Sequence, residues 1–181
     1  MASVPVFLCA ALAVLALGAC SPKYNWRDYA SPEAGYRVTF PAKPSSATRS
    51  VDLDGMRVSM TMTAAEVDGA TFAVGAAEAP DAARARGALD AMRLALLRNI
   101  GAAPTAGRTA SASASSSAAE GGTSRTVVDV DATGSGQGGP LRLVGHFEAR
   151  GTRIYQVIVV AKDKTVPPEQ IEQFLTSFTL H

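Results

Sequence analysis

The chain has 181 residues, with 17 Lys and Arg against 16 Asp and Glu, so its formal net charge is +1. This near balance argues against a nucleic-acid partner, because binding a phosphate backbone needs clustered positive charge. Apolar residues make up 47 % of the chain, an ordinary fraction for a globular protein, which argues against wholesale disorder. The length predicts a single domain.

The first twenty residues combine an apolar run with a short motif. Residues 4–19 read VPVFLCAALAVLALGA and carry no charge. This run is shorter than the about 20 residues that span a membrane as a helix, and it suits the apolar core of a signal peptide. Its end, LGAC at residues 17–20, resembles the lipobox of bacterial lipoproteins, in which an aliphatic residue and two small residues precede a Cys.

The lipobox resemblance implies that residues 1–19 are removed and that Cys20 is acylated, which would anchor the protein to a membrane. It also implies, through Ser21, an outer-membrane site facing the periplasm. An uncleaved anchor and an ordinary secretory signal are the alternatives. Cys9 would leave with the signal peptide, so no thiol would remain for redox or zinc chemistry. We expect residues 20–34 to be a lipidated terminus and tether, in which Trp26 and Tyr29 cover the edge of the core.

Residues 35–181 are expected to form one domain that begins with a meander of strands. Alternation of apolar and polar residues, with a tight turn at Asp54-Gly55, predicts strands at 36–40, 49–53, 56–63 and 71–77. Apolar residues at helical spacing then predict a helix from Asp81 to Ile100, which Gly101 would end.

The rest of the domain is expected to contain three more strands and a second helix. Residues 101–125 are rich in Ala, Ser, Gly and Thr and predict a flexible surface insertion, with a poor edge strand near 108–115 as the alternative. Strands are predicted at 126–130, 141–149 and 153–160, with a loop at 131–139, and a helix begins at Pro167-Pro168. The strand at 153–160 is apolar on both faces and should be central. The pattern predicts an α+β fold: a mostly antiparallel sheet of about six or seven strands with helices packed on its faces.

Two terminal stretches resemble the PsbP-like family of exported bacterial proteins. Residues 28–44 read DYASPEAGYRVTFPAKP, and residues 169–180 read EQIEQFLTSFTL. The resemblance implies an αβα sandwich around an antiparallel sheet. It implies no catalytic residues, since members of this fold act mainly in binding or assembly.

Two motifs with chemical potential have simpler structural interpretations. Residues 134–139 contain a literal GxGxxG, but Pro140 and a strand follow it where a phosphate-binding loop needs a helix, so a flexible β–β loop is favoured. Met56, Met60 and Met62 could bind Cu(I), but their period of two favours a stripe in the core.

The charged candidates are spread along the chain. His146, Glu148, Asp129 and Arg142 could form an enzyme or carrier site if the fold brought them together, although a surface or half-buried strand His is favoured. A Ca²⁺ site of Asp129 and Asp131 with Asp52 or Asp54 lacks a ligand frame, so a solvated strand face is favoured. The predicted helix 81–100 offers a candidate partner surface, formed by Arg84, Arg86, Arg93 and Arg98.

The sequence therefore predicts a lipid-anchored envelope protein that displays a non-catalytic binding or assembly module in the periplasm. Its expected partners are the membrane, through lipid on Cys20, and an envelope protein, with no cofactor. The alternatives are a periplasmic small-ligand or metal carrier and an enzyme whose site is assembled in space.

Overall fold

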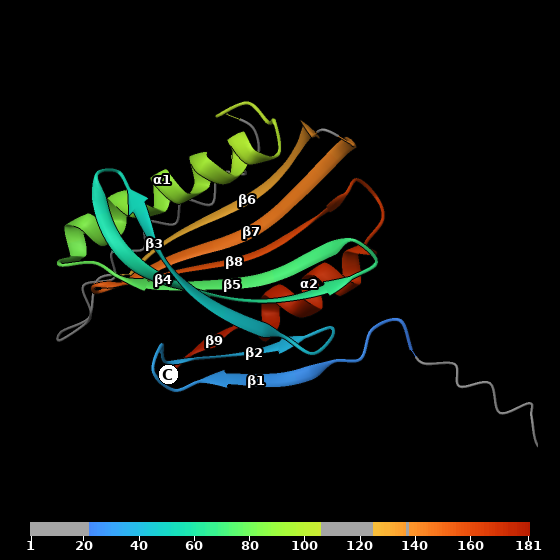
Figure 1. Ribbon diagram of the computed structural model, residues 1–181, viewed down its shortest axis with the longest axis horizontal. Coiled ribbons are helices and arrows are strands. Elements are labelled where there is room, and N and C mark those ends of the chain that lie inside the picture. Colours follow the sequence, from blue (N-terminus) through green and yellow to red (C-terminus); the bar gives the residue numbers. More distant parts are fainter. Residues whose placement is uncertain (1–21, 106–124, 137) are drawn as a thin grey trace, which may run out of the picture.

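The structure is a computed structural model that describes residues 22–105, 125–136 and 138–181. It consists of two antiparallel sheets and two helices, which confirms the predicted α+β class (Figure 1). The elements in chain order are β1 (Arg27–Ser31), β2 (Tyr36–Phe40), β3 (Ser45–Leu53), β4 (Met56–Val67), β5 (Ala70–Glu78), α1 (Ala82–Asn99), β6 (Arg125–Gly136), β7 (Gly139–Arg150), β8 (Arg153–Lys162), α2 (Pro168–Ser177) and β9 (Thr179–Leu180).

The larger sheet has six strands in the order β3-β4-β5-β8-β7-β6, and every neighbouring pair is antiparallel. β8 lies inside the sheet and is covered on both faces, as its sequence predicts. Ile154 and Ile158 belong to the core beneath α1, whereas Tyr155 and Val157 belong to the core on the opposite face. Two apolar layers therefore share this one sheet.

Helix α1 covers one face of the sheet, chiefly over β6, β7 and β8 (Figure 1). It begins where the side chain of Asp81 accepts a hydrogen bond from the Arg84 amide at 2.8 Å. Ala85, Leu89 and other small or aliphatic residues on one side of α1 are buried, which is the helical pattern seen in the sequence. Gly101 follows with a φ of 70°, a conformation that favours glycine and ends the helix as predicted.

The opposite face is covered by α2 and by a small sheet in the order β1-β2-β9 (Figure 1). Three aromatic rings join the layers: Phe174 of α2 lies 5.4 Å from Phe40 of β2 and 5.3 Å from Phe72 of β5, measured between ring centroids. All three side chains are fully buried. The second core therefore depends on contacts between the two ends of the chain.

The expectation of a tether over residues 20–34 was wrong for part of this stretch. Arg27–Ser31 form β1, which pairs with β2 so that Tyr29 opposes Val38. The residues of β1 are exposed or half-buried and show little apolar alternation. This segment is a strand because it pairs with the free edge of β2. Trp26 and Tyr29 do pack against the core, as expected: Trp26 contacts Phe72 edge to face.

The predicted loop at 131–139 was also wrong, because β6 continues to Gly136 and pairs with β7 along its whole length. Gly134 has no room for a side chain, since a Cβ there would collide with the carbonyl oxygen of Ile100 and lie 2.7 Å from the Ala102 amide nitrogen. The GxGxxG pattern therefore contains a packing glycine where the end of α1 crosses β6.

The first hairpin of the large sheet is longer than predicted. β3 begins at Ser45, and β4 continues to Val67. Thr63 is fully buried, although it is polar, and it accepts a hydrogen bond from the Tyr36 hydroxyl at 3.3 Å. The reason is that the small sheet covers this end of β4.

Several predicted features lie outside the described residues. These are the apolar run and lipobox at residues 4–20, and positions 106–124 of the predicted insertion. Within the described part of the chain, no helix is long and apolar enough to cross a membrane.

Candidate functional site

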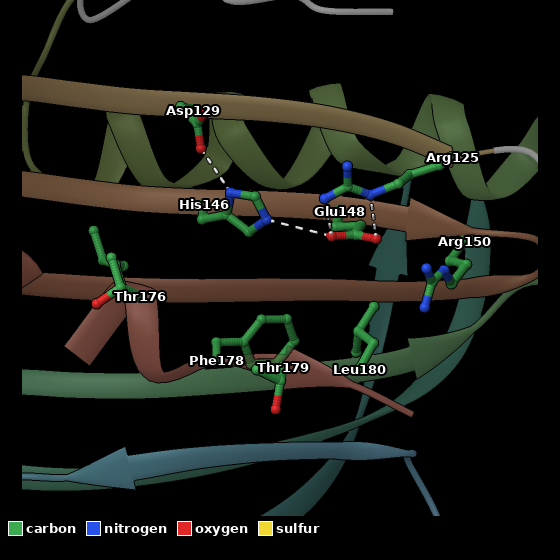
Figure 2. Close-up of a pocket in the computed structure, with 10 residues that line it drawn as sticks. Arg125, Asp129, His146, Glu148, Arg150, Thr176, Phe178, Thr179 and Leu180 are labelled. Atoms are coloured by element: carbon green, nitrogen blue, oxygen red, sulfur yellow. Dashed lines mark hydrogen bonds and ion pairs between the residues drawn. The ribbon is translucent and has the colours of Figure 1, made fainter. Parts of the chain in front are cut away.

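An open groove of about 550 Å³ lies on the face of β6 and β7 that is turned away from α1 (Figure 2). Its floor comes from the two strands and its far wall from the end of α2, β9 and the residue between them. The lining residues are Arg125, Asp129, His146, Glu148, Arg150, Leu175, Thr176, Phe178, Thr179 and Leu180. The groove therefore combines charged side chains on one side with a largely apolar wall on the other.

His146 stands at the centre of the charged side, between two carboxylates. Its Nδ1 lies 2.7 Å from Asp129 Oδ1, and its Nε2 lies 3.4 Å from Glu148 Oε2. Asp129 is the cross-strand partner of His146, and Glu148 is two residues further along β7, so strand register alone brings the three together. An imidazole donates from both nitrogens only when it is protonated. The geometry therefore favours the imidazolium.

Glu148 is held by Arg125 as well as by His146. The Arg125 Nε and Nη2 donate to the two carboxylate oxygens at 2.8 and 3.0 Å, a bidentate pair. Only 5 % of the Glu148 side chain is exposed, whereas 51 % of Arg125 is. Burial acts to raise the pKa of Glu148, but its hydrogen bonds and the two neighbouring positive charges outweigh burial and lower this pKa from 4.5 to about 2.

The same network raises the pKa of His146, whereas it lowers that of Glu148. Burial acts to lower the pKa of His146, but the hydrogen bonds to Glu148 and Asp129 outweigh burial and raise this pKa above its ordinary 6.5. The order Asp129, His146, Glu148, Arg125 is thus an alternating chain of negative and positive charges along the groove (Figure 2).

The facing wall is formed by the chain that leaves α2. Leu175, Phe178 and Leu180 are half-buried and line the groove. The Phe178 ring lies 6.5 Å from the His146 ring and 5.8 Å from Tyr155, measured between centroids. This wall is fixed in place because β9 pairs with β2, where Leu180 opposes Tyr36.

Three of the four residues proposed for an assembled site come together, and one does not. Asp129, His146 and Glu148 share the groove, whereas Arg142 makes its own bidentate pair with Asp131 at 2.8 and 2.9 Å. His146 is half-buried on its strand, as expected.

Sequence reasoning missed Arg125 and Arg150, which lie at one end of the groove. They are direct cross-strand partners in β6 and β7. The register of that hairpin would have revealed them, but the wrongly predicted loop at 131–139 hid it.

The four helix arginines do not form a common surface. Arg93 is buried and donates to the carbonyl oxygen of Pro104 at 3.0 Å, so its inclusion in an exposed partner face was wrong. The chain after α1 folds back over this side chain and supplies the acceptor. Arg84, Arg86 and Arg98 are exposed, and Arg84 makes an ion pair with Asp81 at 3.7 Å.

The candidate metal ligands are otherwise engaged. Met60 is buried in the core under α1, and the sulfur of Met62, which packs against that core, accepts a hydrogen bond from Gln156 at 3.2 Å. The Asp52 side chain accepts from the Gly55 amide within its own turn. Across residues 22–105, 125–136 and 138–181, no group of three or more His, Cys, Asp and Glu is placed to hold a metal ion.

Chemically, the groove presents fixed charges on one side and an apolar wall on the other. Both nitrogens of His146 are engaged by carboxylates, so the ring offers no free lone pair to act as a base. Within the described residues, no hydroxyl or thiol group hydrogen-bonds His146, as a nucleophilic site would require.

No protein-family model and no curated protein matches this chain.

Proposed function

We propose that this protein is a lipid-anchored cell-envelope protein that displays a non-catalytic binding or assembly module on the periplasmic side of the outer membrane. The anchor rests on the sequence, where the apolar run of residues 4–19 ends in the lipobox and Cys20. The module is the α+β domain, and its binding site is the groove between β7 and the wall formed by Leu175, Phe178 and Leu180.

The distance between anchor and domain supports a role at the membrane surface. Tyr24 and Trp26 already pack against the second core. Three residues separate Cys20 from Tyr24, and the four Cα–Cα steps between them span at most about 14 Å when the chain is extended. A lipid on Cys20 would therefore keep the domain next to the bilayer, where an assembly partner would also be held.

One observation carries the choice of binding over catalysis: both ring nitrogens of His146 are occupied by carboxylates. A catalytic His must hand a proton to a substrate, and here the competing acceptors are Asp129 and the buried Glu148. The groove instead presents fixed charges and an apolar wall, which is the composition expected of a recognition site.

A small-ligand carrier or an enzyme is the second candidate function. The pKa of Glu148 is lowered and that of His146 is raised within one concave site, and such perturbed pairs cluster at functional sites. The metal-carrier alternative is less well supported, because Met60 and Met62 face the core.

We also propose that the domain belongs to the PsbP-like fold. The support is the resemblance at residues 28–44 and 169–180, together with helices on both faces of an antiparallel sheet. This fold would be consistent with a binding or assembly role.

The anchor is tested by labelling cells with palmitate and separating membrane from soluble protein. The wild-type chain should carry label and sediment with the membrane, and Cys20→Ser should lose both properties. Cys9→Ser is the matched control, since it makes the same chemical change inside the apolar run and should behave as wild type. Label and sedimentation that survive Cys20→Ser would contradict the lipoprotein assignment.

The binding role is tested by crosslinking and affinity capture of the tagged protein from envelope extracts. Wild type should recover a specific envelope component, and Cys20→Ser should not, because the unanchored chain is no longer held beside it. Recovery of nothing from either chain, with both chains soluble, would contradict the proposal and favour a soluble carrier or enzyme.

A further inference from the structure

Three arginines lie in register across three strands, and two of them, Arg125 and Arg150, line one end of the groove. Arg125 of β6 opposes Arg150 of β7, and Arg150 opposes Arg153 of β8. Directly opposed residues in an antiparallel pair project from the same face, and like charges in this position destabilise the sheet. Glu78 of β5 opposes Arg153 on its other side, so the opposed pair Arg125 and Arg150 is the part of this row that favours a bound anion.

The chain supplies two carboxylates to this row: Glu148 lies in the groove, and Glu78 of β5 opposes Arg153. Glu148 accepts two hydrogen bonds from Arg125. Within the described residues, neither Arg150 nor Arg153 makes an ion pair with an acidic side chain. Arg150 is exposed and lines the groove, so its donors are open to a ligand, as is the part of the Arg125 guanidinium that does not face Glu148.

The other acidic group of the groove cannot neutralise this end. Asp129 is hydrogen-bonded to His146, which lies four residues before Arg150 in β7 and so away from the arginine end of the groove (Figure 2). With His146 protonated, the acidic side chains of Asp129 and Glu148 are already balanced by His146 and Arg125. The positive charge of Arg150 is therefore left uncompensated in the groove.

An apolar surface lies beside the arginine end. Figure 2 shows Phe178 and Leu180 following the groove in the same direction as His146, Glu148 and Arg150. Leu180 and Phe178 are only half-buried, so part of each side chain faces the cavity. A ligand whose charged group meets Arg150 would lay its remaining atoms along this wall.

We infer that the groove binds an amphipathic oxyanion: a carboxylate or phosphate held by Arg150 and the outer edge of Arg125, with an aliphatic or aromatic part against Phe178 and Leu180. Guanidinium groups match both oxyanions through paired hydrogen bonds. The cavity of about 550 Å³ is large enough for a small organic ligand. This inference rests on the proposed function, since it names the ligand class of that same groove.

The inference is tested by calorimetric titration of the full chain with hexanoate, acetate and hexanamide. Hexanoate should bind about tenfold more tightly than acetate, because its extra methylene groups meet the apolar wall. Hexanamide keeps that apolar part but lacks the charge, and it should bind at least about tenfold more weakly than hexanoate. Equal binding of hexanoate and hexanamide would overturn the inference.

Two arginine variants locate the site. Arg150→Gln should weaken hexanoate binding about tenfold or more, because a charge-assisted pair of hydrogen bonds is lost. Arg98→Gln is the matched control, since this exposed arginine lies near the end of α1 on the other face of the sheet, and it should bind hexanoate as wild type does. Unchanged binding by Arg150→Gln, with a normal unfolding midpoint, would overturn the assignment to this groove.

Hexyl phosphate distinguishes the two headgroups. Tighter binding than hexanoate would identify a phosphate-bearing ligand, and weaker binding a carboxylate; either result supports the inference. If none of these anions binds while an envelope component is still captured by the anchored chain, the ligand class is wrong and the proposed binding role stands. Absence of palmitate label from the wild-type chain would contradict the lipid anchor but not the ligand class of the groove.

Discussion

At the scale of single residues, the groove is governed by one buried carboxylate and the imidazole beside it. Glu148 is nearly inaccessible to solvent, so its charge persists only because Arg125 and His146 surround it. His146 is flanked by Asp129 from β6 and Glu148 from β7, and the Phe178 ring approaches from the facing wall. The network is therefore both a source of stability and a pH-dependent part of the site.

Replacement of Glu148 by Gln should destabilise the protein in a pH-dependent manner. The pKa of Glu148 is lowered from 4.5 to about 2, so its contribution is present above pH 4.5 and is lost as the pH falls toward 2. At pH 7 the loss should be about 3 kcal/mol, from 1.36 kcal/mol per pKa unit. Urea unfolding at pH 7 and at pH 3 measures this loss of stability. The control Glu66→Gln, at an exposed site on β4, should leave the free energy of unfolding unchanged at both pH values. Equal destabilisation by Glu148→Gln at both pH values would contradict this account.

His146 should contribute stability in the opposite pH direction. Its pKa is raised in the folded protein, so the stabilisation is complete below pH 6.5 and disappears as the pH rises through the folded-state pKa. Wild type should thus lose stability relative to His146→Gln as the pH rises above 6.5. The proton NMR titration of His146 gives this pKa directly. A midpoint at or below 6.5 would show that the two carboxylates do not hold the proton.

At the scale of elements, α1 and β6 are held together by a close backbone contact at Gly134. The end of the helix crosses the strand there, and Gly101, which ends α1, stands against Ser135. This contact fixes the edge strand that supplies Arg125 and Asp129. The core beneath α1 therefore positions a site on the other face of the same sheet.

Gly134→Ala should destabilise the protein by about 2 kcal/mol, because the added methyl group collides with the Ile100 carbonyl and the backbone must shift. Gly87→Ala is the matched control on the exposed side of α1, where a Cβ meets nothing within 4 Å. It should stabilise the helix by about 0.5–1 kcal/mol. Urea denaturation of both variants tests the pair, and a neutral Gly134→Ala would contradict the close contact.

The elements that could be predicted from the sequence are those whose signals are local. The helix after Asp81, the turn at Asp54-Gly55 and the doubly apolar β8 each carry their pattern within a few residues. β1 and β9 could not be predicted, because each becomes a strand only by pairing with β2.

The candidate site was predictable only in part for the same reason. His146 and Glu148 lie two residues apart, and Asp129 joins them through strand register. Arg150 can be recognised as a site residue only once the strand register places it opposite Arg125. The wall at Phe178 comes from a distant segment of the chain. Sequence patterns give neither register nor distant contacts.

At the scale of the whole molecule, one sheet carries two cores that are stabilised differently. The core under α1 is built from elements between β3 and β8, whereas the second core joins β1 and β2 to α2 and β9. Since the groove wall belongs to the second core, its position depends on that long-range packing.

Phe174→Ala should destabilise the protein by about 3–5 kcal/mol and should loosen the second core selectively. Its ring contacts Phe40 and Phe72, which link the small sheet to the large one. Phe147→Ala removes an equally buried ring from the core under α1. Native-state hydrogen exchange should accelerate in β2 for the first variant and in α1 for the second. Equal acceleration of both elements in both variants would contradict two separable cores.

The central claim, that an anchored domain binds its partner or ligand in the groove, is tested most directly by a photoreactive amino acid placed at Thr179 on the groove wall. The control position is Arg86, on the exposed side of α1. In intact envelopes, we predict a specific crosslink from Thr179 that is lost with Arg150→Gln or Cys20→Ser, and none from Arg86. A crosslink from Arg86 alone would contradict the assignment of the groove as the binding site, and one from Thr179 that survives Arg150→Gln would contradict the role of Arg150 in binding.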